Sequence, residues 1–164
     1  MRVWRASSGD SMASQLSDLE RLIALEEIKR LKARYFRCID TRDWEGFTAC
    51  FAPDAVMDVS GESERLRKDE HGVYRGAEAI GAWGERAAAG IQTRHQVLMP
   101  EVDVTSASAA SGIWAIEDRF WWPEGAGPHR TLHGWGYEHE TYRKLAGSWK
   151  IQTSRFQRLR TEYT

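Results

Sequence analysis

The apolar residues in the first third of the chain recur at steps of three and four, which is the spacing of one face of a helix. Ser17, followed three positions later by Glu20, forms a capping-box pattern and predicts where this helix begins. Charged residues such as Arg30 and Arg34 fall on the opposite face, which we expect to be solvated. The apolar stripe comprises Ala24, Ile28, Leu31, Tyr35, Cys38 and Ile39.

Two polar residues of this predicted helix are unexpected if folding alone mattered. Tyr35 lies in the middle of the stripe, and a buried hydroxyl without a partner costs about 1–3 kcal/mol, so we expect a hydrogen-bond partner or a wet cavity there. Asp40 lies where the helix ends, and the helix dipole disfavours a carboxylate at that end. Asp43 has an ordinary explanation as the N-cap of a short second helix.

The remaining pattern predicts one more helix and a set of long strands. We expect a short strand at 55–59, a charged loop at 61–72, a third helix at 76–89, and long strands at 91–105, 107–122, 129–144 and 148–162. This order predicts an α+β fold, a cone-shaped α+β barrel with three N-terminal helices packed in a strongly curved mixed or antiparallel sheet. Residues 1–16 are interpreted as a disordered tail or an overlong start, and 17–164 as a single domain.

Alternation along the strands identifies two further candidate residues. Asp118 is the only carboxylate on a face that it shares with Trp114, Ile116, Phe120 and Trp122, so it is expected to face the interior unless that face meets a partner subunit or solvent. His95 shares a face with Val97 and Met99. From spacing alone, a single histidine in such a setting is more often a core or interface residue than a catalytic one.

Composition and charge exclude several classes of function. A net charge of −1 and a pI near 6.5 give no basic surface for nucleic acid. No apolar run approaches membrane-spanning length and the first residues lack the apolar segment of a signal peptide, so we expect no membrane partner and a cytoplasmic location. Cys38 and Cys50 have no metal-ligand spacing and are expected to be reduced core thiols. Because the histidines lack ligand spacing too, we expect neither a metal nor a cofactor.

The segment RYFRCIDTRDWEGFTACFAPDAV resembles the opening of the nuclear transport factor 2-like superfamily, in its SnoaL-like branch. The resemblance runs from about residue 19 to residue 163, and its nearest chemistry is that of bile-acid 7α-dehydratase, scytalone dehydratase and hexachlorocyclohexane dehydrochlorinase. It implies that Asp40 pairs with His95 and that Tyr35 and Asp118 occupy further site positions. Arg155 is similar to an arginine on the last strand of these enzymes, although Arg158, which would face the opposite side, lies only three residues further on.

The resemblance also implies a lyase or dehydratase that removes water or HX from a hydrophobic cyclic or carbonyl-bearing small molecule without a cofactor. His95 would abstract the proton, Asp40 would orient it, and Tyr35 with Asp118 would assist the oxygen or leaving group. Arg155 would steer an anionic part of the substrate, while the aromatic residues Trp114, Phe120 and Trp135 would line its pocket.

Two other classes of function remain open at this stage. The superfamily also contains noncatalytic small-molecule-binding modules and the structural small (β) subunits of ring-hydroxylating dioxygenases. We further expect a homo-oligomer, with a trimer favoured over a dimer.

Overall fold

The first helix is bounded by a capping residue at its start and by a left-handed residue at its end. The computed structural model describes residues 16–62, 71–126 and 129–164. Helix α1 (Asp18–Thr41) starts at the N-cap Ser17, where both hydrogen bonds of the predicted capping box are present. It ends at Arg42, whose φ of 64° places it in the left-handed region that closes many helices. The predicted apolar stripe is buried, and Lys32 and Phe36 are buried with it.

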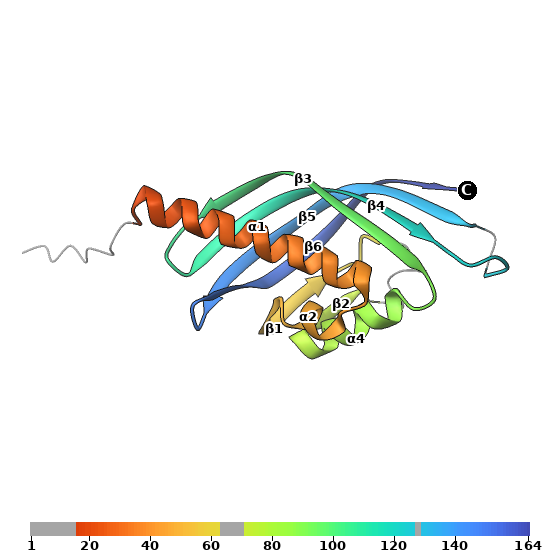
Figure 1. Cartoon of the computed structure of the whole chain (residues 1–164), viewed down its shortest axis with the longest axis horizontal. Helices are drawn as coiled ribbons and strands as arrows, with labels where there is room; N and C mark the ends of the chain where they lie inside the picture. Colours follow the sequence, from red (N-terminus) through yellow and green to blue (C-terminus); the bar gives the residue numbers. More distant parts are fainter. Residues whose placement is uncertain (1–15, 63–70, 127–128) are drawn as a thin grey trace, which may run out of the picture.

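Two short helices follow in the chain. Helix α2 (Trp44–Thr48) is capped by Asp43, whose carboxylate accepts a hydrogen bond from the backbone N–H of Gly46 at 2.8 Å, as predicted. Helix α4 (Ala77–Ala87) lies within the predicted range 76–89. Both lie at the bottom of the view in Figure 1, beside β1 (Phe51–Asp58) and β2 (Val73–Arg75).

The four long strands form the main part of a six-stranded sheet. They are β3 (Gln92–Val104), β4 (Ala109–Trp121), β5 (Thr131–Leu145) and β6 (Ser148–Tyr163), and the sheet order is β2-β1-β6-β5-β4-β3. Strand β1 runs parallel to β6, whereas the other neighbours are antiparallel. Helix α1 lies along one face of this curved sheet (Figure 1). The predicted α+β fold and mixed sheet are confirmed, but the sheet stays open between β2 and β3 and does not close into a barrel.

Two local predictions were wrong. The strand predicted at 55–59 begins earlier, because β1 starts at Phe51; its Pro53 lies where the pairing of β1 with β6 shifts register, which a residue without an N–H tolerates. Strand β2 was not predicted because three residues are too few to show a period. The predictions for residues 1–15 of the tail and for residues 63–70 of the charged loop lie outside the described residues.

The core lies between α1 and the concave face of the sheet. Cys38 and Cys50 are buried there as free thiols, as expected. Among the described residues, no helix has the length and apolar character needed to cross a membrane.

Candidate active site

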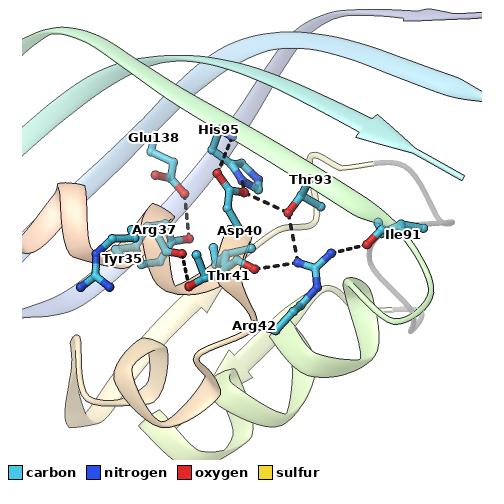
Figure 2. Close-up of polar contacts among 10 residues, drawn as sticks. Tyr35, Arg37, Asp40, Thr41, Arg42, Ile91, Thr93, His95 and Glu138 are labelled. Atoms are coloured by element: carbon cyan, nitrogen blue, oxygen red, sulfur yellow. Dashed lines mark hydrogen bonds and ion pairs between the residues drawn. The ribbon is translucent and has the colours of Figure 1, made fainter.

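The carboxylate at the end of α1 contacts the histidine of β3. The Oδ1 atom of Asp40 lies 2.7 Å from Nδ1 of His95, and its Oδ2 atom accepts a hydrogen bond from the His95 backbone N–H at 3.0 Å (Figure 2). The two side chains are 18% and 11% exposed, so the pair is largely shielded from water. An imidazole whose Nδ1 is bonded to a carboxylate presents Nε2 as its basic atom. The pairing that the resemblance implied is therefore present in the structure.

A second set of contacts holds Asp40 in place. The Thr93 hydroxyl donates to Asp40 Oδ1 at 2.9 Å, and the Arg42 guanidinium donates to that hydroxyl oxygen at 3.1 Å (Figure 2). Arg42 also donates to the backbone carbonyls of Ile39 and Ile91, which ties the end of α1 to the start of β3. The left-handed conformation of Arg42 aims its side chain at this junction, so the turn that ends the helix also orients the carboxylate.

The surroundings of the dyad favour an ionised carboxylate beside an imidazole. Burial would raise the pKa of Asp40, but the hydrogen bonds and charge of His95, together with the Thr93 hydroxyl, outweigh it and lower that pKa. The imidazole stacks on the Phe36 ring with centroids 5.0 Å apart and lies 5.5 Å from the Phe120 ring. These rings limit the orientations that the imidazole can adopt.

His95 and Tyr35 open onto one cavity of about 90 Å³, which is enough for several water molecules or a small organic ligand. Its polar groups come from α1, β3, β4 and β5 and from Glu62 after β1, and they include Asp118 and Glu138. The rest of its wall is mostly apolar, formed by residues such as Phe36, Ile39, Trp83, Ile91, Ile116, Phe120 and Phe156. A cavity of this kind suits a hydrophobic ligand with one or two polar groups.

Asp118 lies directly across the sheet from His95 and is buried, as strand alternation predicted. Its two carboxylate oxygens each lie 3.0 Å from Nη1 of Arg158, and Arg158 also contacts Glu62. Burial would lower the pKa of Arg158, but the two carboxylates outweigh it and raise that pKa. In this arrangement both oxygens of Asp118 accept hydrogen bonds from Arg158 at the wall of the cavity.

The four predicted substrate-binding residues do not lie together in the structure. Phe120 lines the cavity as expected. Arg155 does not: it is exposed on the opposite face of β6, and Arg158 is the arginine that faces inward, because residues three apart on a strand lie on different faces. Trp135 also lies on that outer face, against the His133 ring. Trp114 is buried in the core, where its indole N–H donates to Tyr142 at 2.6 Å, and it does not border the cavity.

His95 and Val97 keep the predicted alternation on β3, but Met99 does not. A register shift between Leu98 and Glu101 turns Met99 outward, where it is 90% exposed. A bulge of this kind cannot be read from hydrophobic alternation.

A buried charged group beside Tyr35 was not predicted from the sequence. Lys32 is fully buried and forms ion pairs with Glu138 and Glu140 of β5, and the Tyr35 hydroxyl donates to Glu138 at 3.3 Å. Lys32 lies four residues after Ile28 and three before Tyr35, so its place in the apolar stripe was a signal that could have been used. Within the described part of the chain, no cluster of three or more histidine, cysteine or acidic side chains could hold a metal ion.

The fold and site define a class of protein: an α+β domain with an open curved sheet and an Asp–His pair at the wall of an apolar cavity. The model of the SnoaL-like domain matches residues 20–155, and the chain belongs to this family. A protein named "Probable cyclase FGR4" from Gibberella zeae is 26% identical over 135 residues, which are 80% of this chain and 89% of that protein.

Solved structures share the fold. A protein named "Putative Scytalone Dehydratase" from Novosphingobium aromaticivorans superposes with a TM-score of 0.77 at 16% identity, over 90% of this chain and 92% of that chain. Hexachlorocyclohexane dehydrochlorinase LinA type 2 superposes with a TM-score of 0.76 at 18% identity, over 90% and 93% of the two chains. At these identities the likeness shows a common fold.

Proposed function

We propose that this protein is a lyase that eliminates water or HX from a hydrophobic cyclic or carbonyl-bearing small molecule. The observation that carries the proposal is the 2.7 Å contact between Asp40 and Nδ1 of His95 at the wall of an apolar cavity. The names of the family's relatives, a cyclase, a dehydratase and a dehydrochlorinase, support lyase chemistry in general.

In the proposed mechanism, Nε2 of His95 removes a proton from the carbon next to the carbonyl or leaving group. Asp40 fixes the tautomer of His95 and stabilises the imidazolium that forms. A base positioned in this way contributes about 10²- to 10⁴-fold to the rate. The apolar wall of the cavity excludes water, so the charge that develops on the substrate is stabilised by the few polar groups that remain.

The proposal is tested by screening for a new conjugated product. Wild type is incubated with a library of hydroxy ketones and hydroxyacyl thioesters, and absorbance reports elimination. His95→Ala and Asp40→Asn should lower kcat by at least about 10²-fold on every responsive substrate. His139→Ala is the matched control, because His139 lies on the outer face and contacts Gln157. If His95→Ala turned over every substrate as fast as wild type, the proposed function would be wrong.

The noncatalytic alternative makes a different prediction in the same experiment. A binding module would bind library members in the cavity, detectable by calorimetry, yet form no product with wild type. A structural subunit would show neither binding nor turnover.

A further inference from the structure

The proposed mechanism leaves one buried charged cluster unused. Lys32 of α1 is fully buried between two glutamates on the inner face of β5: its Nζ lies 2.7 Å from Glu140 and also contacts Glu138. The Tyr142 hydroxyl donates to the second oxygen of Glu140. We refer to Lys32, Glu138 and Glu140 as the triad.

The charges of the triad do not balance when all three groups are ionised. Two carboxylates and one ammonium leave one negative charge in a region from which water is excluded, and an unpaired buried charge is strongly disfavoured. One added proton makes the triad neutral. Burial raises the pKa of Glu140, in agreement with a proton retained at this site. An ion pair of one lysine and one glutamate already has no net charge. The second carboxylate is therefore not needed to neutralise Lys32, and it provides a place to hold a proton.

The triad reaches the cavity through one member. Glu138 lines the cavity beside Tyr35, whose hydroxyl lies 3.3 Å from its Oε1. Burial and the nearby Glu138 carboxylate raise the pKa of Tyr35 well above its usual value, so the tyrosine cannot give up its proton alone. It can pass a proton on only if Glu138 supplies another.

Resting on the proposed function, we propose that Glu138 is the general acid of the elimination, supplied by the proton that the triad holds. As the C–H bond breaks and its proton goes to His95, the bond between carbon and the leaving oxygen breaks. Lys32 gives a proton to Glu138 and takes the proton held at Glu140, Glu138 passes its proton to Tyr35, and Tyr35 gives its own proton to the leaving oxygen. Both glutamates end as carboxylates paired with the Lys32 ammonium. The His95 imidazolium then releases its proton to solvent and the triad takes up one proton from solvent through Tyr35, so protons balance over the cycle.

The other polar and charged groups around Glu138 have partners of their own. Tyr35 faces it from α1, and Tyr142 is bonded to Glu140 on the same strand. Asp118 on β4 lines the same cavity and is paired with Arg158 of β6, while His95 of β3 is paired with Asp40. The Lys32 ammonium is the only cation that contacts Glu138 among the described residues.

The first test compares leaving groups, because chloride departs without a proton and hydroxide does not. A β-hydroxy ketone that wild type converts is compared with the β-chloro ketone of the same skeleton. Glu138→Gln should lower kcat by at least about 10²-fold on the hydroxy ketone and by less than about threefold on the chloro ketone, with KM unchanged. His95→Ala should lower kcat on both, so the two proposals are tested separately.

Glu140→Gln is the sharper variant, because Glu140 is away from the cavity lining. It leaves Lys32 and Glu138 as a neutral pair without the extra proton, so kcat on the hydroxy ketone should fall as in Glu138→Gln while the chloro ketone is spared. Glu117→Gln is the matched control, since Glu117 bonds His133 on the outer face. Equal losses on both ketones, or no loss on the hydroxy ketone, would overturn the general-acid role.

A second measurement needs no substrate and keeps the proposal testable if the proposed function fails. Infrared spectra of the whole protein at neutral pH should show the C=O band of one protonated carboxyl, and both Glu138→Gln and Glu140→Gln should lack it. Circular dichroism confirms that each variant is folded. A wild-type spectrum without this band would overturn the proposal.

Discussion

Gly134 lies opposite Asp118 in the sheet, and a methyl group there would disturb the Asp118–Arg158 ion pair. A Cβ atom at position 134 would lie well inside van der Waals contact with both Nη1 of Arg158 and Oδ1 of Asp118. In Gly134→Ala, we therefore expect the guanidinium to move off the carboxylate.

The expected cost follows from the burial of the pair. The Asp118 side chain is 4% exposed and that of Arg158 10%. Breaking a buried ion pair costs about 3–5 kcal/mol when one partner is removed. Here Arg158 remains and keeps its contact with Glu62, so we expect the lower end of that range. Replacing glycine by alanine also restricts the unfolded chain, which returns about 0.4–1 kcal/mol. The net loss should be about 2 kcal/mol.

Urea denaturation of Gly134→Ala measures this loss. With a slope of about 2 kcal/mol per molar, the midpoint should fall by about 1 M. The same substitution in an Asp118→Ala background should cost about 0.5 kcal/mol or less, because the neighbouring carboxylate is gone and Arg158 is free to shift. An equal cost in the two backgrounds, or no cost in wild type, would show that Gly134 does not clear space for the ion pair.

Three further outcomes are expected. The pKa of Asp40 is lowered in the folded state, so its contribution to stability is present above about pH 4 and is lost as the pH falls through the folded pKa. The difference in unfolding free energy between wild type and Asp40→Asn should therefore shrink from pH 6 to pH 3. A constant difference would contradict the pairing. Burial, reinforced by the hydrogen bond to Asp43, raises the pKa of Cys38 to about 11, so iodoacetamide at about pH 8 should label this thiol slowly until urea unfolds the protein, with Cys38→Ala as control. Ser17→Ala should destabilise the protein by about 1 kcal/mol in thermal or urea unfolding, because it removes the capping box of α1.

Most helices and strands could be predicted from the sequence, because hydrophobic periodicity is a local property of the chain. The apolar stripe of α1, its capping box and the alternation of β4 are each visible within a few turns or residues, and each is confirmed. Strand β2 has only three residues and therefore no period to detect. The bulge that turns Met99 outward likewise leaves no mark on the hydrophobic pattern.

Only part of the candidate site could be predicted from local sequence patterns. Asp40 and His95 were singled out from local patterns, but their pairing came only from a resemblance, because their contact spans 55 positions of the chain. The choice between Arg155 and Arg158 depended on strand register, and a slip of one residue exchanges the two faces of a strand. Lys32 could have been noticed in the apolar stripe, but nothing in its own segment indicates that two glutamates of β5 neutralise it.

The amino-acid sequence by itself determined the three helices, the four long strands and the buried faces of α1 and β4. The tertiary structure decided which carboxylate meets which cation: Asp40 meets His95, Asp118 meets Arg158, and Glu138 with Glu140 meets Lys32. The physical reason is distance. Propensity and amphipathic pattern act over a few residues, whereas a buried charge takes the partner that packing brings within about 3 Å, however far away that partner lies along the chain.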